Sequence, residues 1–92
     1  MLKELFRAKN YIVIAFASTH HALEAESLLE GKVEFIVMPT PREISASCGL
    51  ALKIHPNDGA VVEKYLHNSN VREYHFYEIE KTGQESKISQ LS

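Results

Sequence analysis

The residue of this chain best suited to covalent chemistry is its single cysteine, Cys48. In the thiolate form a cysteine attacks sulfur or selenium and binds metal, whereas the neutral thiol is a poor nucleophile. Cys48 stands in a segment without hydrophobic periodicity that runs from Pro39 to Gly49. Hairpin loops usually contain about 2–5 residues, and this segment is about twice that length. Its length, with Pro39 and Pro41 fixing φ at its entry, is typical of a pre-shaped functional loop.

A second group of residues is expected to lie near this loop. The first predicted strand ends just before Thr19 and His20, where the next helix begins. If Cys48 lies at the start of a strand beside that end, the loop and the start of the helix meet at one edge of the sheet. The amide groups at a helix start favour negative charge. We therefore expect these amides, together with Arg42, to lower the pKa of the Cys48 thiol. Gly49 would leave the backbone open to an incoming group.

Two other interpretations of the cysteine stay open. Free cysteine is often buried as a small, inert hydrophobic residue, and Cys48 would then have no chemical role. Alternatively, Cys48 could be the covalent nucleophile of an enzyme, with His20 or His21 as the neighbouring base.

The histidines of the chain do not form a pattern of metal ligands. Adjacent histidines on a helix point about 100° apart, and the remaining histidines lack the spacing of metal ligands. The sequence therefore predicts no metal site and no cofactor.

The elements that must position these residues follow from the hydrophobic pattern. A short run that is apolar at every position is typical of a central strand covered on both faces. Alternating or β-branched segments predict further strands, and apolar residues at three- and four-residue spacing predict helices. The predicted strands are 11–17, 32–38, 50–55 and 71–80, and the predicted helices begin at residues 18–19 and 57–58 and end near 31 and 67.

The predicted order β-α-β-β-α-β is that of a ferredoxin-like sandwich. We expect one α+β domain over residues 1–80, in which a four-stranded antiparallel sheet carries two helices on one face. Residues 81–92 are polar, and we expect them to be a disordered tail. The sheet face without helices would expose apolar residues, which favours a homodimer or a partner packed against it.

Charge and cysteine content restrict the classes of partner. The chain has 10 basic and 12 acidic side chains, a formal charge of -2, and its basic residues are scattered. Such a pattern gives no grip on a phosphate backbone or a membrane surface, so we expect neither nucleic acid nor membrane as a partner. A small secreted domain usually needs several cysteines for disulfides. The single cysteine indicates a reducing compartment, and we expect a cytoplasmic location.

The chain also resembles a known family, the selenium/sulfur carrier-like family of small bacterial proteins. The resemblance lies in residues 16–20, 22–29 and, most specifically, 39–52, which include the prolines, Arg42 and Cys48-Gly49. It implies that Cys48 carries sulfur or selenium as a persulfide or perselenide, with Arg42 and Gly49 shaping the site. A sulfur or selenium donor enzyme and an acceptor protein are then the implied partners. The full candidate site comprises Cys48 with Pro41, Arg42, Ser47, Gly49, Thr19 and His20.

Two functional hypotheses follow. The first is a carrier or thiol-transfer protein that uses Cys48 and need not turn over a substrate itself. The alternative is a binding or regulatory module without covalent chemistry, which dimerises or docks a partner through its open sheet face. The sequence does not distinguish sulfur from selenium, and it does not identify the donor or the acceptor.

Overall fold

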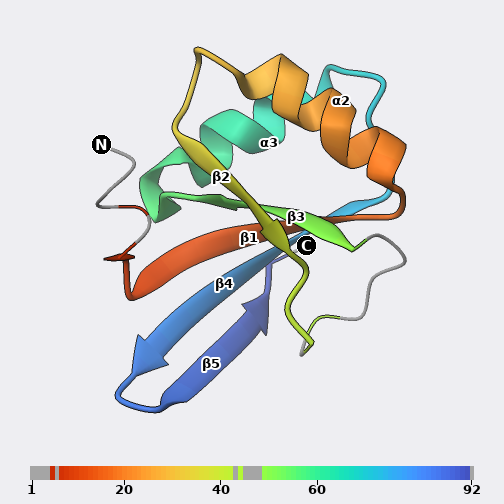
Figure 1. The fold of residues 1–92 in the computed structure, drawn as a ribbon. Coiled ribbons are helices and arrows are strands. Elements are labelled where there is room, and N and C mark those ends of the chain that lie inside the picture. Colours follow the sequence, from red (N-terminus) through yellow and green to blue (C-terminus); the bar gives the residue numbers. More distant parts are fainter. Residues whose placement is uncertain (1–4, 6, 43, 45–48, 92) are drawn as a thin grey trace.

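The fold consists of a five-stranded antiparallel sheet with two helices packed on one face (Figure 1). The computed structural model describes residues 5, 7–42, 44 and 49–91, and all structural statements concern these residues. The order of the strands across the sheet is β2-β3-β1-β4-β5. The elements are β1 (Asn10–Phe16), α2 (Thr19–Leu29), β2 (Phe35–Pro39), β3 (Leu50–Ile54), a 3-10 turn η1 (Pro56–Asp58), α3 (Gly59–His67), β4 (Tyr74–Thr82) and β5 (Glu85–Gln90).

Strand β1 is the centre of the sheet and pairs on both sides. All its residues after Asn10 are buried, which explains why the sequence is apolar at consecutive positions instead of alternating. Successive side chains of a strand point to opposite faces. Ile12, Ile14 and Phe16 therefore face the helices. The other buried residues of β1 face the opposite side, which we call the helix-free face; they are Tyr11, Val13 and Ala15.

The main core lies between the sheet and the two helices. Helix α2 buries residues at three- and four-residue spacing, Ala22, Ala25 and Leu29, because that spacing returns to the same side of a helix. Helix α3 buries Val62 and Leu66 in the same way. The strands supply the opposite wall of this core with Ile12, Ile14, Phe16, Leu52, Ile54 and Phe76.

The helix-free face is not bare at its centre, which corrects the expectation of a large exposed apolar surface. Ile44, in the segment between β2 and β3, is only 4% exposed. It packs in one cluster with β1 residues such as Val13, with Ala51 of β3 and with Ile79 of β4. The chain after β2 therefore brings Ile44 over this face. Partly buried side chains remain around the covered centre, among them Met38, Tyr77 and Ile88.

The α+β class, the two helices and the antiparallel sheet were predicted correctly, but the number of strands was wrong. Apart from the 3-10 turn η1, the elements from β1 to β4 follow the β-α-β-β-α-β order of the ferredoxin-like prediction, and a fifth strand then extends the sheet beyond β4. Residues 85–90 form this strand in place of the predicted disordered tail, and β4 continues to Thr82, past the expected domain end at residue 80. The turn between them contains Gly83 at φ 63, a conformation that glycine adopts without strain.

No helix in the described ranges is long and apolar enough to span a membrane.

Candidate functional site

Three separate segments meet at the edge of the sheet where β1 ends. This edge is formed by strand ends, and it differs from the outer strands β2 and β5. Ala15 pairs with Ala51 of β3, and Phe16 pairs with Tyr74 of β4. Because both pairings are antiparallel, the end of β1 lies beside the starts of β3 and β4. Helix α2 begins directly after β1, so its first turn lies at the same edge (Figure 1). This edge is the location that the sequence predicts for the site.

The base of the β2–β3 loop is held by an extension of the strand ladder. The backbone N–H of Thr40 donates to the carbonyl oxygen of Gly49 at 2.9 Å, one position beyond the Pro39–Leu50 pair. Gly49 is exposed, and a methyl group added to it would meet no heavy atom within 4 Å among the described residues other than its chain neighbours. The residue that follows Cys48 in the sequence therefore lies at an open surface.

The entry of the loop is fixed by a turn and by a buried side chain. The N–H of Ile44 donates to the carbonyl oxygen of Pro41 at 3.0 Å. The buried Ile44 side chain then holds this turn against the helix-free face. Arg42 stands inside the turn with an exposed side chain. The sequence predicted a stiff entry from its prolines, and the Ile44 contact adds a second cause of stiffness that periodicity did not show.

The start of α2 has the features of an anion-tolerant helix end. Ser18 is extended (φ -147, ψ 156), and its side-chain oxygen accepts a hydrogen bond from the N–H of His21 at 3.3 Å. This is the N-cap geometry that serine favours. The first turn of α2 contains no acidic residue, so no side-chain carboxylate of this turn offsets the positive end of the helix dipole. Thr19 and His20, the first two residues of the helix, are exposed at this edge.

The structure thus places five of the seven predicted site residues. Thr19 and His20 lie at the start of α2, Pro41 and Arg42 lie in the loop entry, and Gly49 lies at the loop base. Ser47 and Cys48 lie outside the described residues, so the position of the thiol relative to these groups stays a prediction.

A contact that the sequence did not predict links the start of α2 to the segment before β4. The backbone N–H of Arg72 donates to Nδ1 of His21 at 3.4 Å, across 51 positions of the chain. The Arg72 side chain is itself held, because its guanidinium donates to the carbonyl oxygens of Ser69 (2.6 Å) and Val71 (2.9 Å). No local pattern signals such a pairing, since it depends on how the two segments meet in space.

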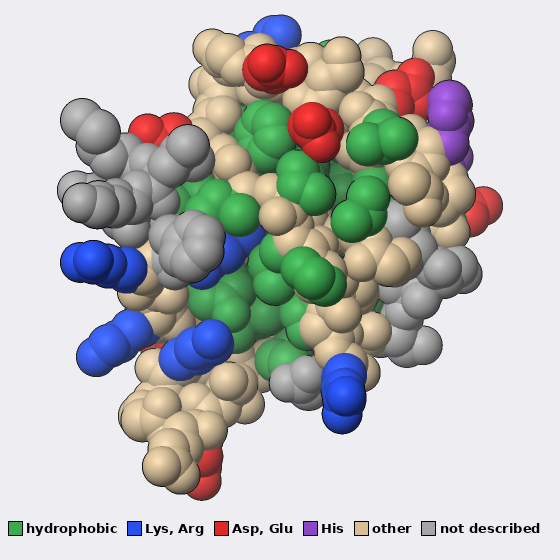
Figure 2. Space-filling view, in the orientation of Figure 1, with side chains coloured by type: hydrophobic (Ala, Val, Ile, Leu, Met, Phe, Trp, Pro, Cys, Tyr) green, Lys and Arg blue, Asp and Glu red, His purple; other side chains and the backbone are tan. Residues whose placement is uncertain are grey.

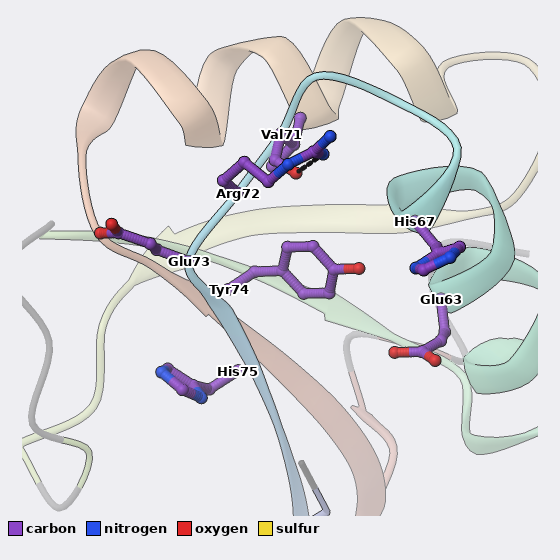
Figure 3. A pocket seen from close by; sticks show the side chains of 7 residues that line it. All are labelled: Glu63, His67, Val71, Arg72, Glu73, Tyr74 and His75. Carbon is purple, nitrogen blue, oxygen red and sulfur yellow. Dashed lines mark hydrogen bonds between the residues drawn. The ribbon is translucent and has the colours of Figure 1, made fainter.

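A pocket of about 620 Å³ lies beside this segment (Figure 3). In Figure 3 the ring of Tyr74 points toward His67 and Glu63, which come from α3. Burial raises the pKa of the Tyr74 hydroxyl, the charge of Glu63 raises it further, and Arg72 opposes the rise. The lining residues are Glu63, His67, Val71, Arg72, Glu73, Tyr74 and His75.

The backbone at this pocket adopts an uncommon conformation. Glu73 has φ 58, in the left-handed region that residues other than glycine seldom occupy.

The pocket contains histidines and carboxylates, which are common metal ligands. Within the part of the chain that the structure describes, however, no group of three or more His, Cys, Asp or Glu residues could hold a metal ion.

The fold and the edge define a class of protein: a small α+β protein whose only cysteine belongs to a long loop between two neighbouring strands. The chain belongs to the family described as Putative Se/S carrier protein-like, which matches residues 11–78. This range covers nearly all of β1, both helices, β2, β3 and the loop with Cys48, and it ends within β4. A search of curated proteins and a search of solved structures each found no match.

The N-cap geometry generates a first prediction. Replacing Ser18 by Ala removes the acceptor of the His21 N–H, so we expect a loss of about 1 kcal/mol in the free energy of unfolding. Ser27→Ala is the matched control, because Ser27 is exposed within the same helix and alanine favours helix. Urea unfolding followed by circular dichroism measures both variants. Equal stability of the two variants would contradict the capping role of Ser18.

Proposed function

We propose that this protein carries sulfur or selenium as a persulfide or perselenide on Cys48, between a donor enzyme and an acceptor protein. The observation that carries the proposal is the family match, which spans the chain's only cysteine. A covalent chalcogen carrier needs a soft nucleophile, and a thiolate is the side chain that supplies it. In this chain only Cys48 can take that role.

The transfer step is a thiol exchange that balances without an external oxidant. The Cys48 thiolate attacks the terminal sulfur of a persulfide on the donor enzyme. The sulfur–sulfur bond of the donor breaks, a new sulfur–sulfur bond forms on Cys48, and the donor leaves as a thiolate. The acceptor protein then removes the terminal sulfur by the same exchange and regenerates the Cys48 thiolate. Selenium follows the same sequence of bonds.

The surroundings of the loop support this role in two ways. The start of α2 offers the positive end of a helix dipole, and the exposed guanidinium of Arg42 adds a full positive charge. Both features favour a thiolate over a thiol at this edge. Thr19 and His20 flank the edge from α2, while Pro41, Ser47 and Gly49 would shape the loop. The open surface at Gly49 suits the approach of a second protein.

Loading of Cys48 is directly measurable. Incubation of the protein with a cysteine desulfurase and cysteine, followed by intact-protein and peptide mass spectrometry, should show one added sulfur on Cys48. The Cys48→Ser variant should show none, and a reducing agent should remove the added mass. A chain that stays unmodified, while a known carrier is loaded under the same conditions, would refute the proposal.

A second candidate function is a binding or regulatory module that dimerises, and one feature favours it. Strand β2 lies at an edge of the sheet and contains no charged residue. Thr40 bonds inward to β3, so the alternate residues Phe35, Val37 and Pro39 direct their backbone groups outward. Val37 is 40% exposed. The other edge strand, β5, is protected by charged residues in the usual way.

The uncharged outer strand β2 therefore favours a homodimer formed by strand pairing, and packing through the centre of the helix-free face is disfavoured because that centre is already covered. Pro39 lacks an N–H, so Phe35 and Val37 are the outward donors of the strand. Sedimentation equilibrium should detect a dimer at high protein concentration, and Val37→Lys should weaken it. The control Lys87→Gln, on the opposite edge strand, should leave the dimer unchanged. A monodisperse monomer at high concentration would remove this candidate.

A further inference from the structure

The helix-free face concentrates positive charge, although the chain as a whole has a formal charge of -2. Directly opposed residues in antiparallel strands share a face. Lys53 opposes Val13, and Lys81 lies two positions after Ile79, which opposes Tyr11, so both lysines belong to this face. Among the described strand residues that share this face there is no acid.

A carboxylate just before β2 is engaged by a histidine. Glu34 lies just before β2, and its Oε2 is 3.0 Å from Nε2 of His55. The hydrogen bond from His55 is the main cause that lowers the pKa of Glu34. In the view of Figure 2, Lys and Arg side chains border the lower part of the hydrophobic area, while most acidic side chains lie toward the upper and right margins.

The ammonium groups of both lysines lie near one aromatic ring, that of Tyr11. Nζ of Lys53 lies 4.1 Å from the centre of the Tyr11 ring, and Nζ of Lys81 lies 5.8 Å from it. Both distances allow a cation–π interaction. Burial lowers the pKa of Lys53, and the positive charge of Lys81 lowers it further. Two ammonium groups near one ring repel each other by Coulomb's law. An anion bound near them would relieve this repulsion.

A cavity of about 230 Å³ opens beside these groups. Its apolar lining comes from Tyr11, Met38, Ile79 and Ile88, and polar atoms make up about as much of its lining as apolar ones. A water molecule takes up about 30 Å³ in the liquid, so a volume of this size accepts a ring with a small charged group. We call it the Lys81 cavity.

The polar groups of the Lys81 cavity stand together. Lys81 and Ser86 both line it, and they are directly opposed in the β4–β5 pair. Pro41, at the entry of the Cys48 loop, also lines the cavity. A few polar groups beside apolar and aromatic side chains are the combination that small-molecule sites use.

We propose that the Lys81 cavity binds a small anion with an apolar body, such as an aromatic or branched aliphatic carboxylate. The anionic group pairs with Lys81 and Ser86, and the apolar body lies against Tyr11 and Ile88. Strand β5, which supplies Ser86 and Ile88, lies outside the range matched by the family. The proposed site does not depend on whether Cys48 carries a chalcogen.

Nuclear magnetic resonance titration of the full chain with benzoate tests the proposal. We expect saturable shifts of the backbone amides around the cavity, at Tyr11, Ile79, Ser86 and Ile88. Benzylamine has the same ring but the opposite charge, and it should give no saturable shift at these amides. Absence of saturation with benzoate up to millimolar concentration, or equal binding of benzylamine, would overturn the proposal.

Variants locate the site. Lys81→Gln should weaken benzoate binding about tenfold, because one charge-assisted hydrogen bond is lost, and Lys81→Arg should restore most of it. Lys87→Gln is the matched control: Lys87 opposes Glu80 in the same hairpin and points to the other face. Equal weakening by both glutamine variants would show attraction to net charge alone and would refute a site at Lys81. An unchanged affinity of Lys81→Gln would refute it as well.

Discussion

The antiparallel pairing of β1 with both of its neighbours is the constraint on which the rest of the structure depends. Every residue of β1 after Asn10 is buried, and the strand contributes to the clusters on both faces of the sheet. Full burial of one Val, Leu or Ile side chain stabilises a fold by about 1.5–3 kcal/mol. A shift of register by one residue would exchange the two faces of the strand. Burial on both sides therefore fixes the strand and its neighbours together.

The position of the candidate site is a consequence of that register. Because Ala15 opposes Ala51 and Phe16 opposes Tyr74, the start of α2, the base of the Cys48 loop and the segment before β4 must meet at one edge. The N-cap at Ser18 and the Thr40–Gly49 hydrogen bond then complete the edge locally. The same register places Lys53 and Lys81 around Tyr11 on the helix-free face. One strand thus organises both the edge of the candidate site and the proposed anion cavity.

The sequence predicted the parts of this fold that depend on strong local patterns. The apolar run of β1, the serine cap of α2 and the apolar spacing of α3 gave elements close to those observed. It failed for β5, because Ile88 is the only apolar residue in that strand and a polar edge strand resembles a tail. The Ile44 contact and the His21–Arg72 hydrogen bond were also missed, since each joins segments that are distant along the chain.

For the candidate site, the sequence predicted the edge and its chemical groups, and the structure adds the contacts that hold them. The loop length, the prolines and the single cysteine directed attention to this edge. The turn between Pro41 and Ile44 was not predicted, because it depends on a hydrogen bond that the residue pattern does not signal. The location of the Cys48 sulfur stays a prediction, so the central claim rests on the reactivity of that thiol.

The rate of Cys48 alkylation by iodoacetamide as a function of pH is the measurement that tests this claim most directly. A peptide spanning residues 45–51 provides the unfolded reference, with a thiol pKa near the ordinary value of about 8.5. If the edge stabilises a thiolate, the rate for the folded protein should rise to half its maximum at a lower pH than the rate for the peptide. Alkylation that follows the peptide curve, lies above it in pH, or occurs only after unfolding in urea would contradict the account.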